Sequence, residues 1–107
     1  MGRPRPSPAP AAARGNLASV YHSAGRLAAA IQLNEQTLAG RQRVLGPVHP
    51  DTLASRTNLA HAYNAIGRLT EAIALLRETL ADCERVLGAN DPLTKTVRES
   101  LKAMTEG

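Results

Sequence analysis

The stretch that decides the fold is NLASVYHSAGRLAAAIQLNEQTLAGRQRVLG (residues 16–46), because it recurs 42 residues later as NLAHAYNAIGRLTEAIALLRETLADCERVLG (residues 58–88). Of the 31 aligned positions, 17 are identical, which is more than shared composition would give. A fixed period of this size is typical of proteins built from stacked repeats. The chain is therefore predicted to be a repeat array and not a compact catalytic domain.

Proline and glycine mark the ends of the predicted helices. The pairs Ser7-Pro8, His49-Pro50 and Asp91-Pro92 share the 42-residue register, and proline at the first helical position sacrifices no hydrogen bond. Gly67 and Gly88 follow apolar stripes with helical spacing, where a left-handed residue ends a helix. The pattern predicts no strand and about five helices: 8–24, 27–45, 50–66, 69–87 and a last one from residue 92.

The repeat register also predicts the organisation of the chain. Helices that are apolar on one stripe cannot bury it alone and must stack on the next pair. We therefore expect an all-α fold, a right-handed superhelical array of antiparallel helix pairs. Its parts are a Pro/Arg tail at 1–6, a first repeat at 7–48, a second repeat at 49–90, and a single C-terminal helix at 91–107 that is a partial third repeat or a cap.

Two differences between the repeats lead to further expectations. Asn34 stands where the second repeat has Leu76, so we expect the first repeat to pack less well and to open first. Cys83 is opposite Arg41 in the register, which predicts a solvent-facing thiol. As the single cysteine of the chain, it cannot form an intramolecular disulfide, as is usual in a reducing cytosol.

Composition argues against several classes of protein. The net charge is +4, of which Arg3 and Arg5 in the tail supply two charges, so support for nucleic-acid binding is weak. The N-terminus has no apolar run typical of a signal peptide, and no stretch is long enough to span a bilayer. We expect a cytoplasmic protein that does not bind a membrane.

The residues that catalysis or metal binding would need are sparse. His22, His49 and His61 are the only histidines and do not have the spacing of a zinc site. The chain has no phosphate-binding loop, no nucleophile elbow and no His-Glu-x-x-His motif. We expect no enzymatic activity, no cofactor and no metal.

The second repeat resembles a known repeat family. Leu59, Ala60 and Tyr63, followed by the turn at Gly67 and then Ala72, are similar to the core of the tetratricopeptide repeat. The 42-residue length and the run VLGPVHPDT at 44–52 resemble the longer variant found in kinesin light chains and in bacterial regulatory proteins. The resemblance implies a superhelix that binds a protein segment in a groove lined by the first helix of each repeat.

The same resemblance implies which residues line that groove. Asparagine suits such a site because its amide both donates and accepts hydrogen bonds, which allows it to hold an extended peptide backbone. Alternatively, Asn16 and Asn58 hydrogen-bond to neighbouring helices and have a structural role. The implied partner-binding residues are Asn16, Ser19 and His22 in the first repeat, beside Gly15, and Thr57, Asn58, His61 and Asn64 in the second, beside Ala54.

The expected function is a non-catalytic interaction module for a protein or peptide partner. Self-association through exposed repeat ends, giving a homo-oligomer, is the first alternative, and a part of a larger regulatory array is the second. Nucleic-acid binding ranks last. Arg14, Arg56 and Arg98 also repeat in register, and this column either attracts an acidic partner or forms a solvated face.

Overall fold

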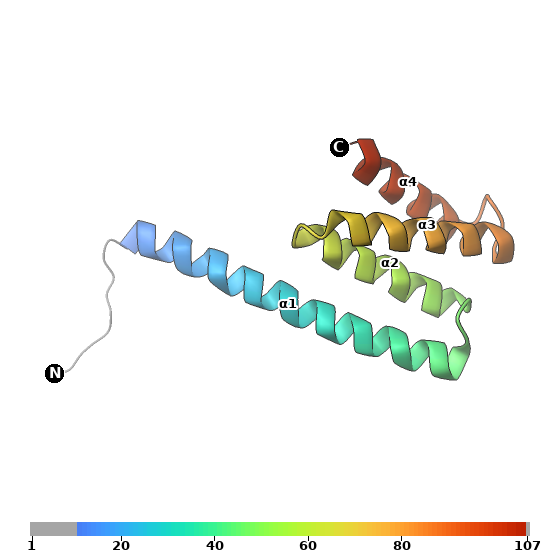
Figure 1. Ribbon diagram of the computed structural model, residues 1–107, viewed down its shortest axis with the longest axis horizontal. Coiled ribbons are helices and arrows are strands. Elements are labelled where there is room, and N and C mark those ends of the chain that lie inside the picture. The colour runs from blue at the N-terminus through green and yellow to red at the C-terminus, as the bar shows by residue number, and fades with distance from the viewer. Residues whose placement is uncertain (1–10, 107) are drawn as a thin grey trace.

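The computed structural model describes residues 11–106, with side chains from residue 25 onward, and is built from helices (Figure 1). Within these residues there are four helices and no strand: α1 (Ala11–Leu45), α2 (Pro50–Ala65), α3 (Leu69–Val86) and α4 (Pro92–Glu106). Each helix packs on the next along the chain. This arrangement confirms the all-α architecture that the repeat pattern predicted. The tail at 1–6 lies outside the described residues.

The proline and glycine signals correctly predicted both ends of α2 and α3 and the start of α4. Gly46, Gly67 and Gly88 have φ values of 96°, 85° and 94°, a left-handed conformation that glycine adopts without steric cost. The Nδ1 atom of His49 accepts a hydrogen bond from the Asp51 amide at 3.0 Å. An Asp91 carboxylate oxygen accepts one from the Leu93 amide at 2.9 Å. These side chains satisfy amides that a helix start leaves free.

The prediction of two helices at 8–24 and 27–45 was wrong. The helix α1 runs without a break from Ala11 to Leu45 and passes through Gly25, so the described residues hold four helices and not five. In Figure 1 the first half of α1 extends away from the other three helices. Residue 25 therefore differs in conformation from its repeat counterpart Gly67, although the two stand at the same register position.

The physical reason lies in what a first hairpin would lack. The hairpin of α2 and α3 is held by buried Leu53 and Leu76 and by an ion pair between Arg56 and Asp82. The corresponding first-repeat positions carry Ala11, Asn34 and Gly40. A hairpin closing at Gly25 would therefore lack both leucines and the carboxylate, which reduces what a break in the helix could gain. A glycine inside a helix costs only about 1 kcal/mol.

The hydrophobic core lies between α2, α3 and α4. Its fully buried members are contributed by all three helices, and partly buried residues such as Leu80, Leu87 and Leu101 pack around them. Burying an aliphatic side chain of this size contributes about 2 kcal/mol. The fully buried cluster consists of Leu53, Ala60, Ala72, Leu76, Cys83 and Val97.

The predicted exposure of Cys83 was also wrong. Its side chain is completely buried in the same cluster as Val97, and burial raises the pKa of the Cys83 thiol. Arg41, at the same register position, instead donates a hydrogen bond to the Ser55 hydroxyl at 2.7 Å. Ser55 is the register counterpart of Val97. A polar pair in one repeat thus replaces an apolar pair in the next, and the register of Cys83 alone gave no sign of this exchange.

The outer side of α4 differs from the corresponding side of α2. Leu53, Thr57 and Ala60 are buried in α2, where they lie on the side toward α3. Forty-two residues later, the same positions in α4 are Lys95, Glu99 and Lys102, and all three are exposed. The α4 helix therefore buries its apolar residues, among them Val97, against α3 and presents charged side chains on its other side.

Candidate peptide-binding surface

A row of polar side chains lies along the exposed side of α2. Asn58, His61 and Asn64 are all exposed and are spaced three residues apart. Side chains with this spacing lie on neighbouring parts of one helix face. We call these three residues the α2 polar row. Three of the four second-repeat residues that the sequence suggested are thus brought together on one accessible surface.

The row continues onto α4 through Ser100. The Nε2 atom of His61 lies 3.2 Å from the Ser100 hydroxyl oxygen, within hydrogen-bonding distance. Ser100 is the register counterpart of Asn58, so two successive repeats contribute to one surface. Ser100 was not among the predicted binding residues, although the 42-residue register identifies it as the counterpart of Asn58.

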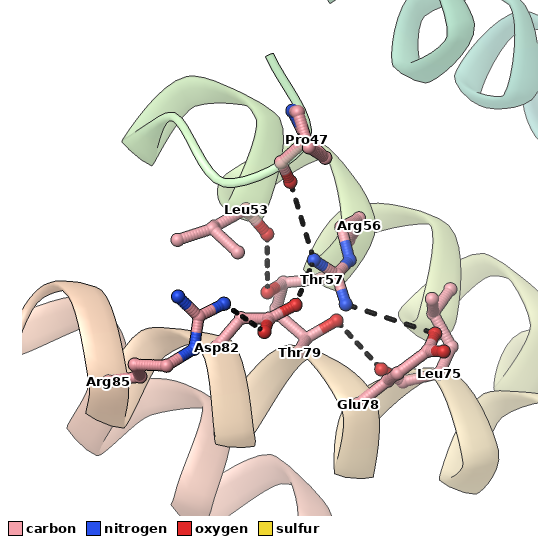
Figure 2. A network of polar contacts seen from close by, with 9 residues as sticks. All are labelled: Pro47, Leu53, Arg56, Thr57, Leu75, Glu78, Thr79, Asp82 and Arg85. Atoms are coloured by element: carbon pink, nitrogen blue, oxygen red, sulfur yellow. Dashed lines mark hydrogen bonds and ion pairs between the residues drawn. The ribbon is translucent and has the colours of Figure 1, made fainter. Parts of the chain in front are cut away.

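Thr57 does not belong to this surface. Its side chain is buried, with 4% of its area exposed, and its hydroxyl donates to the Leu53 carbonyl at 3.0 Å. On α3, Thr79 does the same with the Leu75 carbonyl at 2.7 Å. Figure 2 shows both threonines in the α2–α3 contact. Because each hydroxyl is satisfied within its own helix, threonine can be buried where a groove residue was expected.

The three first-repeat residues are not brought beside the α2 polar row. Asn16, Ser19 and His22 belong to the first half of α1, and their side chains lie outside the described ones. The backbone of this half runs away from α2, α3 and α4 (Figure 1). The chain therefore presents only the second-repeat part of the predicted groove together with Ser100.

Arg56 is part of an internal polar network and not of a solvated face (Figure 2). Its side chain is 7% exposed, and its guanidinium lies 2.8 Å from an Asp82 carboxylate oxygen and 3.8 Å from one of Glu78. It also donates to the Pro47 carbonyl at 3.4 Å. Hydrogen bonds from Arg56 first, and then from Arg85, lower the pKa of the Asp82 carboxyl group.

The repeated arginine has a structural role in both described repeats. Arg98 donates to the Ala89 carbonyl at 3.4 Å, and Ala89 is the register counterpart of Pro47. Each arginine thus reaches back to the loop that precedes its own helix. Arg98 also lies 3.4 Å from a Glu84 carboxylate oxygen. The solvated-face interpretation is wrong at Arg56, whose side chain is 7% exposed, whereas Arg98 keeps 41% of its side chain exposed. The Arg14 side chain lies outside the described ones.

A pocket of about 700 Å³ lies on the other side of α2, between α2 and α3. Tyr63 in its wall donates to a Glu35 carboxylate oxygen at 2.9 Å, and the Arg68 guanidinium lies 4.5 Å from the centre of its ring. Burial, and then the Glu35 carboxylate, raise the pKa of Tyr63. Since Tyr63 is two residues from His61, about 200° around the helix, the pocket is separate from the α2 polar row. Its lining consists of Leu59, Tyr63, Glu71, Ala74, Leu75, Arg77 and Glu78.

The described part of the chain holds no group of three or more His, Cys, Asp and Glu side chains placed to bind a metal ion. Over the same residues, no helix has both the length and the apolar character needed to cross a membrane. The α2 polar row and Ser100 present amide, imidazole and hydroxyl groups, which donate and accept hydrogen bonds.

Helices that stack in sequence and share a 42-residue register define a helical-repeat protein. The tetratricopeptide repeat model matches residues 10–85, and the chain belongs to that family. Proteins with this repeat generally mediate protein–protein interactions and are generally not catalysts. Among curated proteins the comparison finds no match.

Proposed function

We propose that this chain is a non-catalytic module that binds an extended peptide segment of a partner protein along the α2 polar row and Ser100. The observation that carries the proposal is the contact of 3.2 Å between His61 and Ser100. It joins two repeats into one polar surface, in which Ser100 is partly exposed. The family supports the same function, since tetratricopeptide repeats generally mediate protein contacts.

The chemistry of the row suits a peptide backbone. Asn58 and Asn64 each offer an amide that donates and accepts. His61 offers its Nδ1 atom, since its Nε2 atom lies within hydrogen-bonding distance of Ser100. Such groups match the alternating N–H and C=O groups of an extended chain without demanding particular side chains. The row carries no fixed charge, so recognition of a terminal carboxylate is not its basis.

Asn16, Ser19 and His22 extend this surface when residues 11–24 lie beside α2, as the register between the repeats implies. The 42-residue period favours the longer variant of the repeat that kinesin light chains and bacterial regulatory proteins carry, and we propose that the chain is of that type. On the same ground we propose a regulatory role, in which partner binding by the array controls an effector. We place the protein in the cytoplasm, where a lone buried thiol such as Cys83 is common.

Selection from a phage library of random 12-residue peptides tests the proposal. The full chain should enrich a set of peptides, and the double variant Asn58→Glu/His61→Glu should lose them at least tenfold, because carboxylates remove donors and repel backbone carbonyls. The matched control is Thr70→Glu/Ala81→Glu, which adds the same charge to exposed positions of α3. Circular dichroism melting establishes that all three proteins are folded.

Equal enrichment by the wild type and the double-glutamate variant would overturn the assignment of the α2 polar row. Loss of binding in the α3 control as well would also contradict it, since the effect would then be one of general charge. A double variant that melts far below the wild type would show that Asn58 and His61 stabilise the fold and are not a binding surface.

A further inference from the structure

One face of α1 is less covered than its counterpart on α3. Ala72, Leu76 and Thr79 of α3 are completely buried. Their register counterparts on α1 are Ala30, Asn34 and Thr37, of which the first two are partly exposed and the third is exposed. We call Ala30, Asn34 and Thr37 the open face of α1. The face is exposed because residues 11–24 continue along the axis of α1 and do not fold over it. On α3, the same positions are covered by α2.

The repeat register identifies the sequence that fits the open face. In the second repeat, α2 packs directly on α3. Residues 11–24 stand 42 residues before 53–66 and repeat the central residues of α2, including its Asn-Leu-Ala and its tyrosine. A helix with this sequence is thus the complement of a face with the sequence of residues 27–45.

The chain cannot supply this complement to itself while α1 is one helix. Residues 11–24 continue the axis of residues 27–45 (Figure 1), and a segment in line with a face cannot turn back to cover it. A helix of 35 residues rises about 52 Å, since each residue adds about 1.5 Å. The complement of the open face therefore has to come from another molecule.

We propose that residues 11–24 of a second copy of this chain pack on the open face of α1, which makes the protein self-associate by exchange of its first helical segment. The exchange also completes the peptide-binding surface. Ser19 and Asn58 stand 42 residues before His61 and Ser100, so the equivalent contact joins Ser19 of the second copy to Asn58. The second copy would then bring its Asn16, Ser19 and His22 beside the α2 polar row. That second part rests on the proposed function, whereas the association itself does not.

The association is expected to be weak and to depend on concentration. The contact between α2 and α3 includes the ion pair of Arg56 with Asp82 and the buried Leu76. The exchanged contact has Gly40 and Asn34 at those two positions. Arg14 of the second copy would therefore meet no carboxylate at residue 40, and the contact would lose part of its apolar area.

Light scattering coupled to size exclusion, on the full chain over a concentration series, tests the exchange. The mass should rise above the 11.3 kDa of one chain as concentration increases. The variant Ala30→Glu should shift the midpoint at least tenfold higher, because it places a carboxylate on the open face. Its control is Ala29→Glu, at an exposed neighbouring position where the second repeat itself carries Glu71.

A mass of one chain at every concentration would overturn the proposal, whether residues 11–24 stay extended or fold back. Identical midpoints for Ala30→Glu and Ala29→Glu would overturn it as well, since association would then use another surface. Far-ultraviolet circular dichroism shows whether each variant keeps the helix content of the wild type. If Ala30→Glu is not folded, the substitution at residue 40 described next is the deciding one.

Installing the missing carboxylate gives a test in the opposite direction. Gly40→Asp supplies a partner for Arg14 of the second copy and should lower the association midpoint by about fivefold, the effect of one partly exposed ion pair. The control Gly40→Asn has nearly the same shape without the charge. A lower mass for Gly40→Asp would mean that the segment closes on its own chain, which contradicts exchange. Peptide selection by the associated protein then tests the binding function separately.

Discussion

The guanidinium of Arg56 and the carboxylate of Asp82 lie 2.8 Å apart across the contact between α2 and α3. Arg56 is almost fully buried, while the Asp82 side chain keeps 25% of its area exposed. A buried guanidinium without its carboxylate is costly because its hydration is not recovered in the folded protein. The pair therefore holds the hairpin of α2 and α3 in a way that surface pairs do not.

Replacing Asp82 with alanine should lower the free energy of unfolding by about 2 kcal/mol. Glu78 remains 3.8 Å from Arg56 and limits the loss. Urea denaturation followed by circular dichroism measures the change. The control is Glu71→Ala, which removes an exposed partner of Arg68 and should leave the midpoint unchanged. Equal midpoints for Asp82→Ala and the wild type would show that the buried pair adds nothing.

The stability that Asp82 provides should be lost in acid. Arg56 first, and then Arg85, lower the pKa of Asp82 in the folded protein below its ordinary value of 3.8. The unfolded chain then takes up the proton more readily, so the contribution is full above the ordinary pKa and is lost as pH falls through the folded pKa. The difference in stability between the wild type and Asp82→Asn should shrink below pH about 4. A difference that is constant from pH 7 to pH 2 would contradict this linkage.

Two threonines that occupy one register position should tolerate replacement by valine. Thr52 and Thr94 are completely buried, and in the described part of the chain neither hydroxyl oxygen has a hydrogen-bond partner. Thr52→Val and Thr94→Val should each raise the free energy of unfolding by about 1 kcal/mol, because a methyl group of similar size ends the desolvation penalty. Thr57→Val is the control, since the Thr57 hydroxyl is bonded to Leu53, and it should not stabilise. The midpoint of urea denaturation is measured for each variant and compared with that of the wild type. A lower midpoint for both Thr52→Val and Thr94→Val would refute the prediction.

Gly25 and Gly67 should respond in opposite ways to alanine. Gly25 lies inside α1, where an added Cβ meets no atom within 4 Å, so Gly25→Ala should stabilise the continuous helix by about 0.5–1 kcal/mol. Gly67 has a φ of 85°, so Gly67→Ala should destabilise the fold by about 1 kcal/mol. Amide hydrogen exchange around residue 25 measures the first effect and urea denaturation the second. Faster exchange in Gly25→Ala would indicate a turn there.

The repeat register predicted α2, α3 and α4 because proline and glycine act locally. Pro50 fixes φ at its own position, and Gly67 allows the left-handed conformation that its turn adopts. Asn58 and His61 are exposed on one face of α2, as helical spacing and the repeat register together suggested, and their role in binding stays a prediction. The backbone conformation of Gly25 was not predictable in this way, because it depends on whether Asn34 and Gly40 give a returning helix enough to pack against.

The other wrong predictions concern the burial and the contacts of single side chains. Cys83 and Arg41 share a register position, yet one packs in a core with Val97 and the other bonds to Ser55. Arg56 is buried because Asp82 stands 26 residues later on the next helix. Thr57 is buried because its hydroxyl has a carbonyl partner in its own helix. Each of these outcomes is a property of a pair, and a pattern read along one chain shows only single positions.

The two ends of the helix stack differ, because the outer side of α4 carries charged side chains. A further helix packed there in the way that α3 packs on α2 would have to strip water from Lys95, Lys102 and Glu99, at a cost of several kcal/mol for each unpaired charge. The α1 side carries no such barrier at Ala30 and Asn34. Any assembly of these molecules should therefore use the α1 side of both partners and leave the α4 side in water, which favours a closed pair of molecules over a growing filament.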